Sequence, residues 1–83
     1  MAIETKDLWQ SAYMLAEGGA LAGVRVEDRQ GKKEAVFVFD GFMVEDLARH
    51  FQSGQAICHL GRLKSSMNHL KEMIFDRTRT YNR

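Results

Sequence analysis

The chain has 83 residues, enough for one small domain with a single hydrophobic core. Hydrophobic residues make up 45% and charged residues 28%, which are ordinary globular proportions and exclude disorder of the chain as a whole. The single cysteine excludes an intramolecular disulfide, and a net charge of +1 argues against nucleic-acid binding on charge alone.

The first residues carry neither a basic segment nor an apolar one, so no signal peptide is expected. The longest apolar run is five residues, Ala35 to Phe39, far short of the roughly 20 that span a bilayer. We therefore expect a cytoplasmic protein with no membrane partner.

A first helix is predicted over residues 6–17. Thr5 is the expected N-cap, and Gly18-Gly19 are expected to end the helix. Its buried stripe is formed by residues at helical spacing, and Trp9 is expected in the core as one of them. The stripe consists of Leu8, Trp9, Ala12, Tyr13, Leu15 and Ala16.

Residues 21–40 are predicted to form a β-hairpin. Pairing Asp28 with Lys33 requires a two-residue or four-residue turn. A three-residue turn with a bulge at Gly31 would instead place Glu34 opposite Val26, so the first register is preferred. In that register Ala22, Val24 and Val26 lie opposite Phe39, Phe37 and Ala35 on a wholly apolar face.

The other face of this hairpin sets Val36 and Val38 against Gly23 and Arg25. The second strand is thus apolar on both faces, and a lone hairpin is barely stable in water. Each face therefore needs a cover, either from the chain's own helices or from a second copy. We predict a homodimer whose interface includes these four residues.

A second helix is predicted over residues 43–52, an extended segment over 55–59, and a last helix from about 60 to 79. The order α-β-β-α-α predicts a single α+β domain over 1–83, with the hairpin packed on helices. A frayed basic tail over 76–83 is the alternative for the end of the chain. The expected core consists of Leu15, Val24, Phe37, Phe39, Leu47, Phe51, Leu63, Met67, Leu70 and Ile74.

Catalytic and metal-binding patterns are not found. Cys58 and His59 are adjacent, but neighbours on a strand point to opposite faces and would not form a catalytic dyad. His50, His59 and His69 lack metal-ligand spacing. We therefore expect no enzyme, no cofactor and no metal site.

Basic residues are concentrated near the C-terminus. Residues 1–59 carry a net charge of −3 and residues 60–83 a net charge of +4. Arginines interleaved with a tyrosine can hold phosphates and stack on bases, although cations are also common in a last helical turn. The candidate contacts are Arg29, Lys32 and Lys33 at the hairpin turn, and Arg77, Arg79, Tyr81 and Arg83 near the end.

Several short motifs resemble those of the domain-of-unknown-function family numbered 5659, whose members are small bacterial and prophage-encoded proteins. The resemblance covers nearly the whole chain and rests on helix starts, helix ends and core positions. It implies a bacterial cytoplasmic setting and a mobile genetic element, but no activity or cofactor. The residues that carry it are Thr5-Lys6-Asp7-Leu8, Ala12, Leu15-Ala16, Gly18, Phe37-Val38-Phe39-Asp40, Phe51, Gly54, Ala56, Leu70-Lys71 and Phe75.

The leading hypothesis is therefore a non-enzymatic interaction domain that binds itself, most simply as a homodimer, and that can also bind another protein. The alternative is a nucleic-acid-binding accessory or regulatory protein of phage or prophage origin. If the basic residues of the hairpin turn and of the C-terminal segment met on one face, the alternative would gain support.

Overall fold

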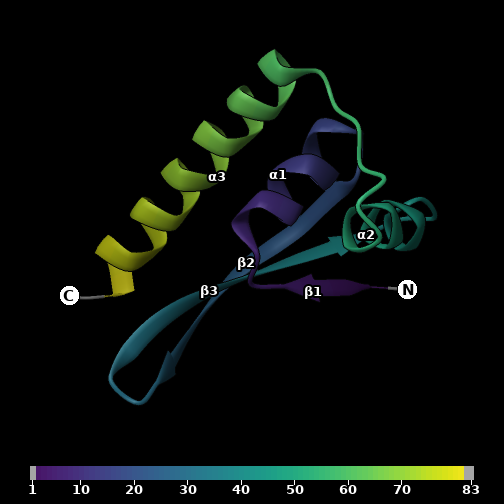
Figure 1. The fold of residues 1–83 in the computed structure, drawn as a ribbon. Helices are drawn as coiled ribbons and strands as arrows, with labels where there is room; N and C mark the ends of the chain where they lie inside the picture. The colour runs from purple at the N-terminus through teal and green to yellow at the C-terminus, as the bar shows by residue number, and fades with distance from the viewer. Residues whose placement is uncertain (1, 82–83) are drawn as a thin grey trace.

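Helices and strands follow one another along most of the chain, and the computed structural model describes the backbone of residues 2–81 and the side chains of residues 2–77. In chain order the elements are β1 (Ile3–Thr5), α1 (Leu8–Ala16), β2 (Ala20–Arg29), β3 (Lys32–Asp40), α2 (Val44–Gln52) and α3 (Leu60–Tyr81). A three-stranded antiparallel sheet packs against the helices (Figure 1). The predicted α+β class is confirmed.

β3 is the central strand of the sheet, with β2 on one side and β1 on the other. The sequence does not predict β1, because three residues are too few to show the alternation of a strand. β1 pairs with β3, placing Ile3 opposite Phe39 and Thr5 opposite Phe37. The central position of β3 explains why its residues are apolar on both faces.

The predicted hairpin register is confirmed over most of its length, since Asp28 lies opposite Lys33. The turn has two residues, Gln30 and Gly31, and both have positive φ angles, 54° and 81°. Two successive positive φ values are those of a type I′ turn, whose twist matches the twist of the paired strands.

The register departs from the prediction at the start of β2. A bulge between Leu21 and Gly23 shifts the pairing, so that Leu21 lies opposite Phe39. Ala22 was expected in that place and is instead exposed. A bulge adds one residue to one strand and reverses the faces on which the following side chains lie. The larger side chain of Leu21 thereby packs against the core cluster that contains Phe39.

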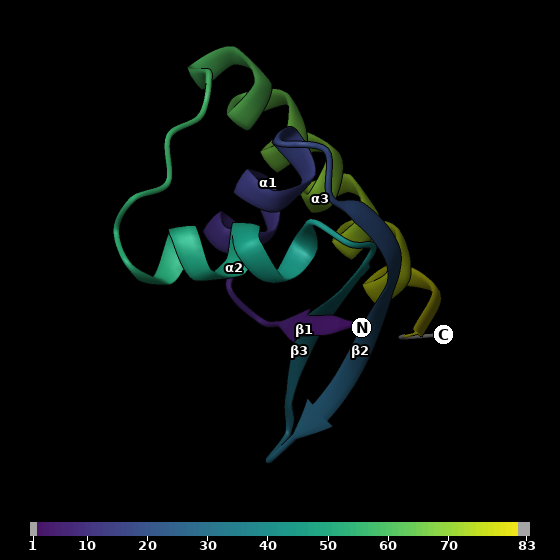
Figure 2. The ribbon, with the colours of Figure 1, turned by 90° about the vertical axis from the view of Figure 1, so that its right-hand side faces the viewer.

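α1 and α3 pack against each other over one face of the sheet, and α2 packs against α1 and β1 (Figure 2). We call the helix-covered face of the sheet the inner face and the opposite one the outer face. The turn of the β2–β3 hairpin projects beyond the helices (Figure 2). The helices therefore cover only part of the sheet.

The core lies between the inner face and the helices, and it contains every residue that the sequence predicts there. Buried among them are Val24, Phe37, Phe39, Leu47, Met67 and Leu70, while Leu15, Phe51, Leu63 and Ile74 are partly buried and pack against this cluster. The ring of Tyr13 lies 6.1 Å from the ring of Phe51 and joins α1 to α2.

The boundaries of the first helix differ from the prediction. Thr5 belongs to β1, and the N-cap of α1 is Asp7, whose carboxylate accepts a hydrogen bond from the Gln10 N–H at 3.1 Å. Thr5 Oγ1 accepts the N–H of Asp7 at 3.1 Å instead. The threonine thus fixes the link between β1 and the helix rather than capping the helix.

Residues 55–59, predicted as an extended segment that could form a short third strand, form neither helix nor strand. The third strand of the sheet is β1. At the other end of the chain, α3 continues to Tyr81, past residue 76, where the sequence left a frayed tail as an alternative.

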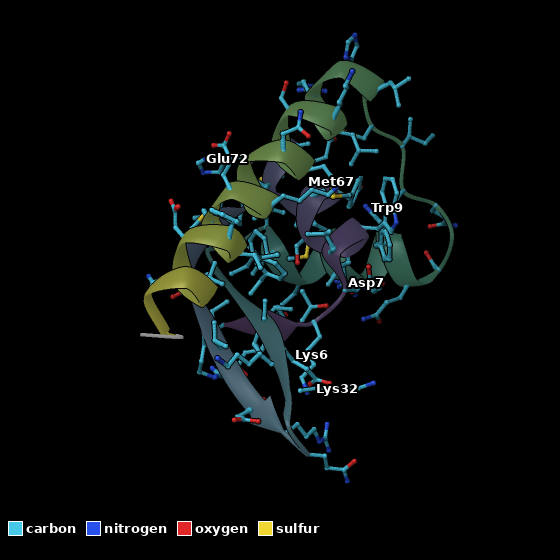
Figure 3. All side chains as sticks on the ribbon, turned by 90° about the vertical axis from the view of Figure 1, so that its left-hand side faces the viewer. Lys6, Asp7, Trp9, Lys32, Met67 and Glu72 are labelled. Atoms are coloured by element: carbon cyan, nitrogen blue, oxygen red, sulfur yellow. The ribbon has the colours of Figure 1, made fainter. Side chains whose placement is uncertain are left out.

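Trp9 was expected in the core, and this expectation is wrong. Its side chain is 61% exposed at the N-terminal end of α1 (Figure 3). The residues on either side of Trp9 are covered, since Leu8 packs against the core and Gln10 is buried. Trp9 therefore lies on the solvent side of the first turn of α1.

Candidate functional site

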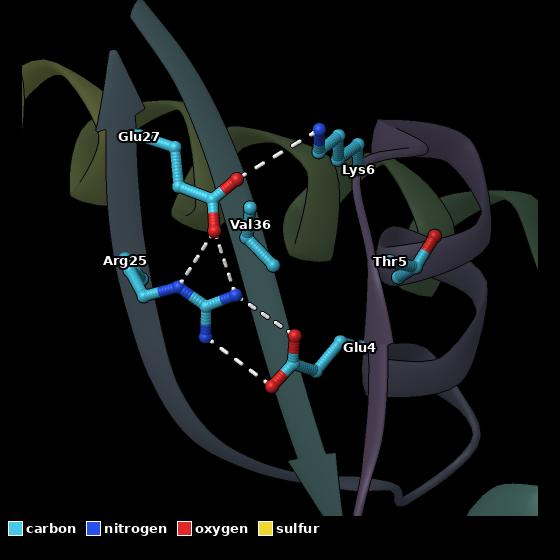
Figure 4. A pocket seen from close by; sticks show the side chains of 6 residues that line it. All are labelled: Glu4, Thr5, Lys6, Arg25, Glu27 and Val36. Atoms are coloured by element: carbon cyan, nitrogen blue, oxygen red, sulfur yellow. Dashed lines mark hydrogen bonds and ion pairs between the residues drawn. The ribbon is translucent and has the colours of Figure 1, made fainter. Parts of the chain in front are cut away.

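The outer face of the sheet carries a cluster of charged side chains, which we call the outer-face cluster. Its residues come from β1 and the residue after it, and from the two strands of the hairpin. Its members are Glu4, Lys6, Arg25, Glu27 and Glu34. All of them except Glu34 line a depression of about 250 Å³, together with Thr5 and Val36 (Figure 4).

Arg25 is the centre of this cluster. Its Nη2 and Nη1 atoms donate to the two carboxylate oxygens of Glu4 at 2.8 and 3.2 Å. Its Nε and Nη2 atoms donate to one carboxylate oxygen of Glu27 at 3.0 and 2.9 Å. The planar guanidinium group can hold two carboxylates in this way because its donors are fixed in a fork.

Lys6 extends the cluster on the other side of Val36. Its Nζ atom lies 2.7 Å from a carboxylate oxygen of Glu34 and 3.8 Å from one of Glu27. Glu27 is therefore shared between Lys6 and Arg25, and the five side chains form one connected network.

Two carboxylates of the network, those of Glu4 and Glu34, have lowered pKa values. The pKa of Glu4 is lowered by its hydrogen bonds to Arg25 and by the charge of that residue, and the pKa of Glu34 is lowered in the same way by Lys6. Bonding to two carboxylates raises the pKa of Arg25. A carboxylate with a lowered pKa is a poor proton donor at neutral pH, so the arrangement suits charge pairing better than general acid catalysis.

The outer-face cluster changes the interpretation of the expected dimer interface. Val36 was assumed to lie on open apolar surface, but its side chain is only 3% exposed beneath Arg25 and its partners. That assumption is wrong, because β1 joins the sheet and brings Glu4 to Arg25 on this face. Val38 and Gly23 are partly buried, and Arg25 is exposed.

The basic residues named for nucleic acid lie in two places. Arg29, Lys32 and Lys33 are exposed at the hairpin turn, and Lys33 lies opposite Asp28. Arg77 is exposed on α3. Figures 1 and 2 show that α3 ends beside the hairpin rather than at its turn. The two groups therefore do not form one continuous basic face over the described side chains.

The remaining candidates of that set fall near the end of the chain. Arg79 and Tyr81 belong to α3, but their side chains lie outside the described part of the structure, as does the whole of Arg83. Binding of nucleic acid stays a prediction.

Cys58 and His59 have separate roles. Cys58 Sγ donates to the backbone carbonyl of His59 at 3.5 Å, while His59 Nδ1 accepts the Gly61 N–H at 3.1 Å and caps the start of α3. Burial raises the pKa of the Cys58 thiol, and the nearby charge of Glu17 raises it further. A protonated thiol is a weak nucleophile, which is consistent with a structural role.

In the part of the chain that the structure describes, no three His, Cys, Asp or Glu side chains gather as potential metal ligands. Within the same residues, no helix is both long enough and apolar enough to cross a membrane.

Comparison with protein-family models gives no match, and neither does comparison with curated proteins or with solved structures. The resemblance to the family numbered 5659 thus stays a prediction.

Sequence reasoning named Arg25 but missed its partners. Lys6 was predicted to begin the first helix, and Glu4 was assigned to no element. One signal was present, since Ile3-Glu4-Thr5 alternates apolar and polar residues just before the helix N-cap. Three residues alone could not distinguish a strand from a loop.

Proposed function

We propose that this protein is a non-enzymatic interaction domain that forms a homodimer. The observation that carries the proposal is the open edge of β2. This strand has ten residues and pairs with β3 on one side, and among residues 2–81 no strand pairs with its other side. A long unpaired strand edge is a template for pairing with another chain.

The geometry of the hairpin identifies the backbone groups at this edge. In a hairpin with a two-residue turn, the residues that flank the turn exchange both backbone hydrogen bonds. Arg29 and Lys32 are that pair, so every second residue counted back from Arg29 bonds to β3. The N–H and C=O groups of the residues between them, Val24, Val26 and Asp28, point to the open edge.

The edge lacks three of the devices that prevent strand pairing. β2 contains neither proline nor lysine, and its bulge lies at its beginning rather than in its middle. The opposite edge of the sheet, β1, is only three residues long. Pairing through β2 is therefore the favoured route for this sheet to extend.

Large apolar side chains are also exposed outside β2. Phe42 is 93% exposed, and other large apolar side chains are also well exposed. Single exposed apolar residues are common on monomers, so these alone decide nothing. The others are Trp9, Met43, Ile57, Leu60 and Phe75.

Sedimentation velocity at micromolar concentration tests the proposal, with a dimer as the expected result. The variant Val26→Pro removes an edge-facing N–H without removing a bond to β3, and it should be monomeric. Val26→Thr keeps that N–H and is the matched control, which should remain a dimer. Far-UV circular dichroism confirms that both variants fold. A wild-type chain that is monomeric throughout the micromolar range would overturn the proposal.

A further inference from the structure

We infer that β2 of one copy pairs antiparallel with β2 of a second copy about a twofold axis at Val26, so that Arg25 of each copy lies opposite Glu27 of the other. The inference rests on the proposed self-association and specifies its register. Three features of β2 lead to the same register: the length of its regular part, the order of its charges, and the direction of its edge-facing backbone groups.

The length of the regular part of β2 is the first feature that selects this register. The bulge ends after Leu21, and the turn begins at Gln30, so the uninterrupted ladder of β2 runs from Gly23 to Arg29. A symmetric antiparallel pair that uses this whole segment has its axis at the middle residue. That residue is Val26.

The order of charges selects the same axis. With the axis at Val26, Arg25 of each copy faces Glu27 of the other on the outer face, which makes two opposite-charge pairs. If the axis lay at Arg25, this arginine would lie opposite Arg25 of the second copy. If it lay at Glu27, the two Glu27 side chains would lie opposite each other. Like charges directly opposite on neighbouring strands are destabilising.

The backbone also agrees with this axis. The edge-facing groups belong to Val24, Val26 and Asp28, as shown above. With the axis at Val26, the N–H and C=O of this residue bond to the same residue of the second copy, and Val24 bonds to Asp28 on each side. Every edge-facing group between the bulge and the turn then has a partner.

The inner face fits a second copy as well. Val26 is only partly buried, and the axis places two valines side by side. A twofold axis perpendicular to the sheet keeps the helices of both copies on the same face. Because α3 contacts β2 and crosses it (Figure 2), the two α3 helices then lie near the axis of a six-stranded sheet.

A cysteine scan along the edge tests the register. In a Cys58→Ala background, Val26→Cys places two thiols on directly opposite residues, whose Cα atoms lie about 5.5 Å apart, within the range for a disulfide. Asp28→Cys is the matched control on the same face. Its two cysteines would be offset by four residues, roughly 13 Å. Mild oxidation should cross-link most of the first variant and only a trace of the second.

Charge exchange gives a second test. Arg25→Glu alone and Glu27→Arg alone should each weaken the dimer about tenfold or more, because both opposite-charge pairs become like-charge pairs. A mixture of the two variants restores both pairs and should form a 1:1 heterodimer with nearly wild-type affinity. Glu4→Gln controls for the loss of the Arg25 partner within one copy, and it should dimerise as the wild type does.

The outcomes distinguish a failure of self-association from a failure of the register. A monomeric wild-type chain overturns the self-association itself. A wild-type dimer that cross-links best at another position, or that ignores both charge changes, overturns the register and leaves self-association standing. A chain that remains monomeric but binds an extended peptide along β2 would show that the edge serves a different occupant.

Discussion

Arg25 and Glu4 join the two edge strands of the sheet across its central strand. The guanidinium group comes from β2 and the carboxylate from β1, and their bonds of 2.8 and 3.2 Å pass over Val36 of β3 (Figure 4). The pair closes the outer face without a second layer of helices. It does so with side chains that are each about half exposed, so its strength depends on salt and pH.

The first prediction concerns this pH dependence. A lowered carboxylate pKa stabilises the folded state at every pH above the ordinary glutamate pKa of about 4.3, and the stabilisation is lost as the pH falls through the lowered value. Glu4 and Glu34 both have lowered pKa values. The melting temperature should therefore be steady near neutral pH and should fall below about pH 4.

The variant Glu4→Gln isolates one contribution. At neutral pH it should melt below the wild type, and the two melting curves should converge in acid because the wild-type carboxylate is then protonated. Glu72→Gln, on the exposed surface of α3, serves as the control and should follow the wild-type profile. A gap between wild type and Glu4→Gln that persists undiminished at pH 2 to 3 would contradict this explanation.

The second prediction concerns the core. Phe37 is 1% exposed on the inner face of β3, so Phe37→Ala should lower the free energy of unfolding by roughly 3 to 5 kcal/mol. This is a large part of the total for a small domain. Phe42→Ala is the matched control, because that ring is 93% exposed, and it should change stability by less than about 0.5 kcal/mol. Urea titration of both variants provides the measurement.

The third prediction concerns the C-terminal end of α1. A Cβ atom added at Gly19 would lie 2.8 Å from the carbonyl oxygen of Met14, which already accepts the Gly19 N–H at 2.8 Å. Gly19→Ala must displace the C-terminal end of α1, and it should lower the free energy of unfolding by roughly 1 to 3 kcal/mol. A Cβ at Gly23 meets nothing within 4 Å, so Gly23→Ala should be close to neutral in thermal melts. Equal stabilities for the two variants would show that the close approach is relieved at no cost.

The fourth prediction addresses nucleic acid. Each phosphate contact contributes about −0.9 to the slope of log affinity against log salt for duplex DNA. We expect no binding of short single-stranded or duplex oligonucleotides in fluorescence anisotropy at tens of micromolar protein, because the described basic side chains are divided between two places. Two results together would establish the alternative function. The wild type would bind tightly at low salt and lose affinity steeply as salt rises, and the double variant Arg77→Ala with Lys32→Ala would show a smaller slope of log affinity against log salt.

Prediction from sequence succeeded where the signal was local. Asp28 opposite Lys33 followed from the turn length and from the alternation of apolar residues, and both depend on neighbours in the chain. The bulge at Leu21 did not follow from these patterns. Its position is decided by which side chain, Leu21 or Ala22, better covers Phe39, and that choice depends on residues from distant segments.

The sequence by itself determined the three helices, the β2–β3 hairpin and the residues of the core, because hydrophobic periodicity and turn chemistry act over a few residues. Only the tertiary structure decided that Ile3–Thr5 joins the sheet. A three-residue strand has no stability of its own and forms only on the edge of β3, so its pairing depends on residues far along the chain. The same contacts bring Glu4 to Arg25 and bury Val36 within one copy, which leaves the edge of β2, rather than the face of β3, open to a partner.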